Sequence, residues 1–99
     1  MKKAAVIEGG YSKEKAISIK SAKTVFDNLD RTKFIPTRVL IDENEWTAYD
    51  EEGRYSIDKN DFSYTKNGSK HNFDYAFIVI HGTPGEDGKL QGYLDMVDI

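Results

Sequence analysis

The chain has 99 residues, of which 38% are hydrophobic and 31% charged, with a net charge of −3 at pH 7. This length allows one domain with a modest core, and the acidic balance argues against binding to nucleic acid or an anionic membrane. No apolar run approaches the ~20 residues of a membrane helix, and the lack of cysteine excludes disulfides and suits a cytoplasmic protein.

Two apolar runs in the first half of the chain predict parallel strands. Residues 3–7 predict the first strand, because the continuous apolar run from Ala4 to Ile7 is typical of a strand covered on both faces, and Gly9 and Gly10 end it. Residues 34–41 form the second run, in which Pro36 disfavours a central position for the early half. With a helix between them, these strands predict a right-handed βαβ crossover.

The segment between these strands has the pattern of an amphipathic helix. The helix is expected from residue 12 or 13 to about residue 28, because apolar residues at spacings of three and four from Ile19 to Leu29 place one apolar stripe on one face. Ser12 is suited to the N-cap, and Glu14 would lie in the first turn, where the helix dipole favours a carboxylate.

Residues 42–73 are rich in aromatic and β-branched side chains that occur in pairs of short runs. The paired runs are residues 46–49 with 55–57, and residues 62–65 with 69–73. Each pair flanks a polar loop that contains glycine, and Asn67-Gly68 is the favoured pair for a type I′ turn. We expect antiparallel hairpins beside the parallel sheet, with the aromatic side chains used for packing.

Residues 74–80 predict a third parallel strand, because residues 76–80 form the most apolar run of the chain. A glycine-rich turn follows, and then a helix from residue 88 or 89 to about residue 97, with Asp87 as the expected N-cap. His81 would lie at the carboxyl end of the strand, where open α/β sheets bind ligands. A strand order of 2-1-3 would bring this end beside Gly9 and Gly10.

Neither glycine-rich turn matches a generic phosphate-binding motif. Gly82 and Gly88 enclose five residues instead of the four of a P-loop, and Leu90 stands where the hydroxyl residue belongs. The first turn has no GxGxxG sequence. Taken alone, the glycines are equally consistent with ordinary connections between strands and helices.

Both turns nevertheless resemble motifs of the D-alanine–D-alanine ligases. The first turn is similar to GGxSxExxVS, with Ile17 in place of Val, and the second to HGxxGEDGxxQGxLE, with Asp95 in place of the final Glu. The matching residues are Gly9, Gly10, Ser12, Glu14 and Ser18 in the first turn, and His81, Gly82, Gly85, Glu86, Asp87, Gly88, Gln91, Gly92 and Leu94 in the second. The resemblance implies a three-layer α/β domain with a parallel, Rossmann-like core and an antiparallel hairpin embellishment.

The resemblance also implies a binding site for the first D-alanine. Glu14 would bind the ammonium group, as a carboxylate can, and Ile17 would contact the methyl group. Ser18, His81 and Gly82 would complete the substrate-binding set, with His81 binding substrate instead of transferring protons.

The remaining motif residues would form the loops around this site. They are Gly9, Gly10, Ser12, Gly85, Glu86, Asp87 and Gly88. Glu86 and Asp87 are adjacent in sequence at a helix start, a position typical of cap and turn residues, so we expect no metal site and no catalytic residue within this chain.

The family's other domains would carry the rest of the reaction. The resemblance implies ATP and Mg²⁺ bound by two ATP-grasp domains, a homodimer, and the synthesis of D-alanyl-D-alanine for peptidoglycan in the cell wall. We therefore expect residues 1–99 to be an N-terminal substrate-binding domain that ends before those domains and is inactive alone.

Two alternatives remain, and some residues depart from the family pattern. Glu8 stands where the family commonly has an apolar or small residue, and Lys15-Ala16 replaces a more typical polar pair. One alternative is a related ligase, such as a D-alanine–D-lactate ligase. The other is a stand-alone flavodoxin-like binding module. A phospho-receiver is disfavoured because residues 74–80 lead into His81 instead of an acceptor aspartate.

Overall fold

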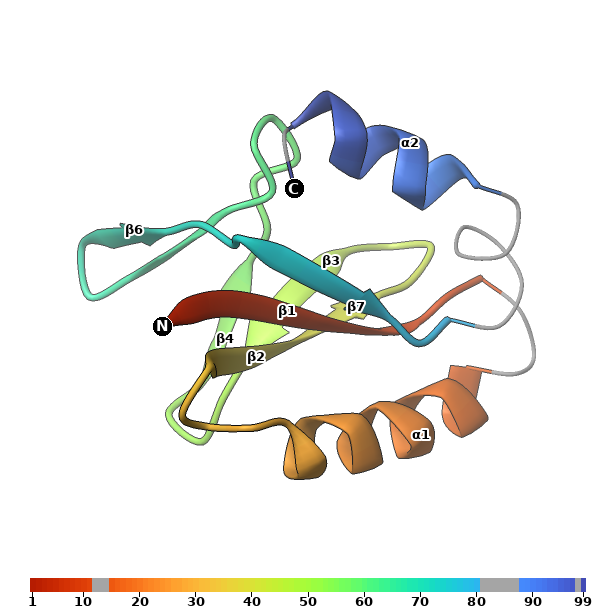
Figure 1. Cartoon of the computed structure of the whole chain (residues 1–99). Coiled ribbons are helices and arrows are strands. Elements are labelled where there is room, and N and C mark those ends of the chain that lie inside the picture. Colours follow the sequence, from red (N-terminus) through yellow and green to blue (C-terminus); the bar gives the residue numbers. More distant parts are fainter. Residues whose placement is uncertain (12–14, 81–87, 98) are drawn as a thin grey trace.

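The computed structural model describes residues 1–11, 15–80, 88–97 and 99. A five-stranded sheet with the strand order β4-β3-β2-β1-β7 lies at its centre (Figure 1). In chain order the elements are β1 (Lys2–Gly9), α1 (Lys15–Asn28), β2 (Phe34–Ile41), β3 (Trp46–Tyr49), β4 (Arg54–Ser56), β5 (Tyr64–Lys66), β6 (Ser69–His71), β7 (Tyr75–Ile78) and α2 (Lys89–Met96).

Strand β1 is the centre of the parallel part of the sheet. It pairs in parallel with β2 on one side and with β7 on the other, which confirms the expected 2-1-3 order. Its residues from Ala4 to Ile7 are fully buried. This burial on both faces explains why the strand reads as a continuous apolar run in the sequence.

Helices cover both faces of the sheet, as Figure 1 shows with α1 on one side and α2 on the other. The larger core lies on the α2 side, where Leu90 and Leu94 pack with Ile7, Val39 and Phe62. Ser18 and Ala22 are the buried residues of α1. The expected three-layer α/β arrangement is therefore confirmed.

The two hairpins have different relations to the main sheet. Strand β3 pairs antiparallel with the last four residues of β2, so β3 and β4 extend the sheet instead of lying beside it. The half of β2 that contains Pro36 has no β3 partner, in agreement with the restriction that proline imposes. Strands β5 and β6 form a separate two-stranded sheet. Asn67 and Gly68 have φ values of 51° and 78°, as their turn requires.

Helix α2 begins without the expected acidic cap. Its N-cap residue is Gly88, with φ of 79° and no side-chain capping hydrogen bond, so the prediction that Asp87 is the N-cap was wrong. Glycine takes this left-handed conformation without steric cost. Neither described helix is long and apolar enough to cross a membrane.

Candidate functional site

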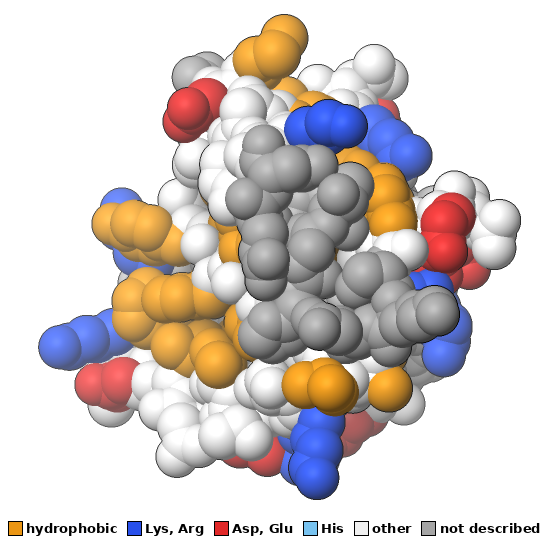
Figure 2. Space-filling model, turned by 90° about the vertical axis from the view of Figure 1, so that its right-hand side faces the viewer, with side chains coloured by type: hydrophobic (Ala, Val, Ile, Leu, Met, Phe, Trp, Pro, Cys, Tyr) orange, Lys and Arg blue, Asp and Glu red, His pale blue; other side chains and the backbone are white. Residues whose placement is uncertain are grey.

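The carboxyl ends of β1 and β7 lie side by side at one edge of the sheet. Ile7 of β1 is in register with Ile78 of β7. Gly9, two residues after Ile7, begins the turn toward α1. The amide of Val79 continues the pairing by donating to the carbonyl of Ile7 at 2.8 Å. Both α1 and α2 begin at this edge, which Figure 2 views face on. The topology therefore brings together the strand ends after which the two motifs follow in the sequence.

The turn after β1 requires glycine. Gly9 and Gly10 have φ values of 98° and 102°, in the left-handed region that L side chains rarely adopt. A Cβ at Gly9 would lie 2.4 Å from the carbonyl oxygen of Ile41. The amide of Gly10 donates to that same oxygen at 2.6 Å. The turn is thus pressed against the end of β2.

Ser18 joins the two strand ends to α1. Its side chain is fully buried, and its Oγ accepts a hydrogen bond from the amide of Gly9 at 3.0 Å. The same hydroxyl donates to the carbonyl of Val79. One side chain of α1 therefore fixes the helix to the ends of both β1 and β7. Its neighbour Ile17 is 59% exposed.

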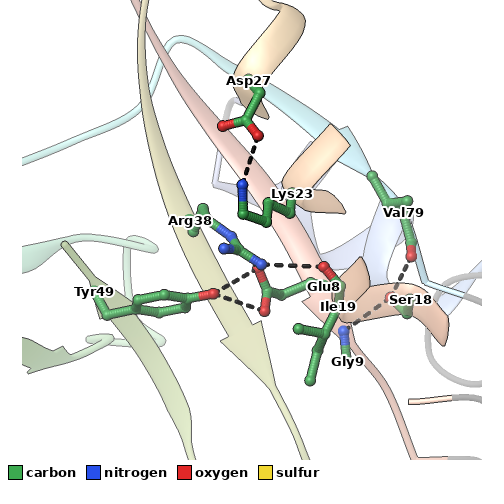
Figure 3. A network of polar contacts seen from close by, with 9 residues as sticks. All are labelled: Glu8, Gly9, Ser18, Ile19, Lys23, Asp27, Arg38, Tyr49 and Val79. Carbon is green, nitrogen blue, oxygen red and sulfur yellow. Dashed lines mark hydrogen bonds and ion pairs between the residues drawn. The ribbon is translucent and has the colours of Figure 1, made fainter. Parts of the chain in front are cut away.

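A buried ionic network lies beneath the start of α1 (Figure 3). Glu8 is 1% exposed, and its Oε1 accepts a hydrogen bond from Nε of Arg38 at 2.7 Å. The hydroxyl of Tyr49 donates to both carboxylate oxygens of Glu8, at 2.9 and 2.8 Å. The other end of the guanidinium, Nη2 of Arg38, donates to the carbonyl of Ile19 at 3.1 Å.

Burial sets the electrostatics of this network. The pKa of Glu8 is raised above 4.5, chiefly because burial disfavours the charged carboxylate, while the hydrogen bonds from Tyr49 and Arg38 and the positive charge of Arg38 oppose the rise. The pKa of Tyr49 is raised as well, first by burial and then by its hydrogen bond to Glu8. Sequence reasoning noticed Glu8 as a departure in an apolar strand, but its partners are 30 and 41 residues away.

The edge also carries an intrinsic fluorescent reporter. Nε1 of Trp46, the single tryptophan, lies 3.4 Å from the hydroxyl of Tyr11 and donates to it. Close by, the ammonium of Lys15 at the first position of α1 pairs with Glu43 at 3.3 Å. Trp46 is therefore coupled to the segment that follows Gly9 and Gly10.

A family model described as "D-ala D-ala ligase N-terminus" matches residues 3–99. The chain belongs to this D-alanine–D-alanine ligase N-terminal family. A curated relative, the D-alanine–D-alanine ligase of Azobacteroides pseudotrichonymphae, is 50% identical over 100 residues, which cover 100% of this chain and 31% of the relative.

Solved structures of ligases share the fold. D-alanyl-alanine synthetase A from Vibrio cholerae matches with a TM-score of 0.82 and 28% identity, over 99% of this chain and 29% of that one. The VanG D-Ala:D-Ser ligase from Enterococcus faecalis matches with a TM-score of 0.81 and 30% identity, over 99% of this chain and 34% of that one. The chain thus spans about a third of the length of the proteins it matches.

The structure places part of the set of site residues expected for this family. Gly9, Gly10, Ile17 and Ser18 lie together at the sheet edge, and Gly88 begins α2 there. The other predicted site residues lie outside the described residues. They are Ser12, Glu14, His81, Gly82, Gly85, Glu86 and Asp87.

Charged side chains of both signs lie on this face of the molecule. In Figure 2, Lys and Arg side chains are scattered among Asp and Glu side chains instead of forming one basic patch on this face. Within residues 1–11, 15–80, 88–97 and 99, no group of three or more His, Cys, Asp or Glu side chains could hold a metal ion.

Proposed function

We propose that this chain provides the binding site for the first D-alanine in an ATP-dependent D-alanine–D-alanine ligase. The observation that carries the proposal is the link that Ser18 makes between Gly9, in the first family motif, and Val79, two residues before the second motif begins. Family membership over residues 3–99 supports the substrate class. The product, D-alanyl-D-alanine, would serve peptidoglycan synthesis and hence the cell wall.

The proposed roles follow from the chemistry of the ligand. Glu14 would pair with the ammonium group of D-alanine, because a carboxylate forms strong charge-assisted hydrogen bonds with it. Ile17 would contact the methyl group, and its 59% exposure leaves its side chain available for such a contact. His81 and Gly82 would line the other side of the ligand. Ser18 would act through the backbone, since both of its hydrogen bonds join main-chain groups.

The rest of the reaction is proposed to belong to segments beyond these 99 residues. The matched relatives are longer, with this chain spanning 31% of the Azobacteroides ligase. ATP and Mg²⁺ would bind in those segments, so residues 1–99 would act as an N-terminal substrate-binding domain that is inactive alone. Dependence on ATP supports a cytoplasmic location, and we extend the proposal to a homodimer, which sedimentation of the purified protein would test.

A related ligase that differs in its second substrate stays a candidate for the function of this protein. The D-Ala:D-Ser ligase from Enterococcus faecalis is 30% identical to this chain. A D-alanine–D-lactate ligase, the alternative that the sequence left open, would also use D-alanine as its first substrate. The site proposed here binds the first substrate, which such enzymes would share. A flavodoxin-like module is not favoured, because the ligase family model covers residues 3–99.

Titration of D-alanine into the ¹⁵N-labelled chain would test the site. We expect amide resonances of Gly9, Gly10 and residues 15–18 to shift with a dissociation constant of millimolar order, about −4 kcal/mol, since a ligand this small offers few contacts. Trp46 fluorescence would follow the same binding. L-alanine should bind more weakly, because it cannot present ammonium, methyl and carboxylate groups in the same arrangement.

Matched variants make this experiment decisive. Glu14→Gln should abolish the shifts, whereas Asp27→Asn, a change of a carboxylate to an amide at the far end of α1, should leave them intact. Equal responses to D-alanine and L-alanine, or full binding by Glu14→Gln, would contradict the proposal.

A further inference from the structure

The second turn of α1 is held by two anchors on consecutive residues. Ser18 binds the amide of Gly9 and the carbonyl of Val79 through its hydroxyl. The carbonyl of Ile19 accepts a hydrogen bond from Nη2 of Arg38, which reaches it from β2. One anchor comes from α1 itself and the other from the sheet beneath, and both act on the turn that follows Ile17.

Arg38 reaches the carbonyl of Ile19 because Glu8 and Tyr49 fix the orientation of its guanidinium group. Glu8 holds Nε of the guanidinium at 2.7 Å from one carboxylate oxygen, and Tyr49 donates to both oxygens of that carboxylate. The guanidinium carbon of Arg38 also lies 5.2 Å from the centre of the Tyr49 ring. Because the guanidinium is planar and rigid, fixing Nε also fixes the direction in which Nη2 points. Figure 3 shows this chain of contacts running from β3 through β1 and β2 to α1.

We propose that Glu8 and Arg38 are positioning residues for the amino-acid site, in that Glu8 orients Arg38 and Arg38 holds the turn of α1 that contains Ser18 and directly follows Ile17. This inference rests on the proposed function of that turn. It assigns a role to Glu8, the residue that departs from the family's usual apolar or small side chain at this position.

Stability alone does not account for such a network. Apolar side chains of similar volume at a buried ion pair are often as stabilising as the pair or more so, because charges are costly to remove from water. An apolar pair at positions 8 and 38 could fill the same space, but it would leave the carbonyl of Ile19 without its donor from β2. What the ion pair provides, and an apolar pair would not, is thus a fixed position for α1.

The test compares the parent chain with Glu8→Leu/Arg38→Met, which replaces the ion pair by apolar side chains. We expect its urea midpoint to stay close to that of the parent. Amides of residues 19–22, which bond to the carbonyls of residues 15–18 in an α-helix, should exchange with solvent about tenfold faster, the equivalent of one lost hydrogen bond to a charged group. Amides later in α1 should be unaffected.

D-alanine affinity links this effect to the site. The double variant should bind D-alanine about tenfold more weakly. This factor equals the free energy of the one charge-assisted hydrogen bond, from Arg38 to Ile19, that the variant loses. Arg38→Lys provides a second variant if the first does not fold. It keeps the positive charge, but a single ammonium cannot reproduce the planar fork toward Glu8 and Ile19, so both effects should persist. Asp27→Asn, which removes an exposed ion pair with Lys23 on the same helix, should show neither effect.

Unchanged exchange at residues 19–22 in a folded variant would overturn the proposal. Faster exchange with unchanged D-alanine affinity would also overturn it, since the network would then hold the helix without serving the site. If the parent chain binds no D-alanine, the proposed function fails, and the exchange experiment by itself still decides whether Glu8 and Arg38 hold α1.

Discussion

The carboxyl group of Glu8 has an unusual effect on stability. Its pKa is raised above 4.5 in the folded chain, mainly by burial, so the folded state retains its proton at pH values at which the unfolded state has lost it. The folded state then binds more protons than the unfolded state, and the stability contributed by this group falls as pH rises. The direction is opposite to that of Asp42, whose pKa is lowered by hydrogen bonds from the amides of Glu45 and Asn44.

We therefore predict the pH dependence of stability for a matched pair of chains. The free energy of unfolding of the parent minus that of Glu8→Gln should decrease as pH rises from below 4.5 through the raised pKa of Glu8, and then stay level. Urea unfolding followed by Trp46 fluorescence at a series of pH values would measure it. A difference that increases with pH would contradict the assignment of burial as the dominant cause.

Tyr49 supplies a control for this experiment. Its hydrogen bond lowers the pKa of Glu8 against the effect of burial. Tyr49→Phe should therefore raise that pKa further, and the decrease in stability should extend to higher pH. Its loss of hydrogen bonds to a charged group should also cost about 1.5 to 3 kcal/mol at neutral pH.

Two glycines with opposite surroundings allow a prediction about the turn after β1 and about helix α2. Gly92→Ala adds a Cβ to a helix interior, where no side chain or backbone atom from outside the local helix lies within 4 Å, and should stabilise the chain by about 0.5 to 1 kcal/mol. Gly9→Ala combines φ of 98° with a Cβ placed 2.4 Å from the Ile41 oxygen, and should destabilise it by about 2 kcal/mol or more. Thermal unfolding of both variants would check the two signs.

The strands and hairpins were predictable because local signals decide them. The apolar runs at residues 34–41 and 74–80 correspond to β2 and to β7, and the Asn67-Gly68 pair forms the expected turn between β5 and β6. The helix start at Gly88 was not predictable in detail. Both an acidic cap at Asp87 and a left-handed glycine are compatible with the sequence there, and the local sequence does not decide between them.

The candidate site was predictable only where the family motifs specify it. The motifs indicated Gly9, Gly10 and Ser18, and the parallel order of β2, β1 and β7 placed the ends of β1 and β7 side by side. The network of Glu8, Arg38 and Tyr49 was not predictable, because it depends on the register of three strands that the sequence does not encode locally. Glu8 marked the position, but an isolated acidic residue in an apolar strand does not identify its partners.

The whole enzyme provides the last test of the proposed function, through a chimera. Residues 3–99 would replace the matching segment of the Azobacteroides ligase, to which this chain is 50% identical. Because the family match spans this entire segment, we expect the chimera to form D-alanyl-D-alanine and to release ADP and phosphate. The isolated 99-residue chain should release no ADP.

Glu14→Gln in the chimera should lower kcat/KM for the first D-alanine by about 100-fold, which corresponds to about 3 kcal/mol for a lost hydrogen bond between charged groups. Asp27→Asn should leave it unchanged, because that carboxylate contacts Lys23 on the exposed side of α1. Coupled measurement of ADP release over a range of D-alanine concentrations separates the first substrate from the second. A folded chimera without ligase activity, or ADP release by the isolated chain, would contradict the assignment, since the first-substrate site and the phosphoryl-transfer site would then not be divided between these segments.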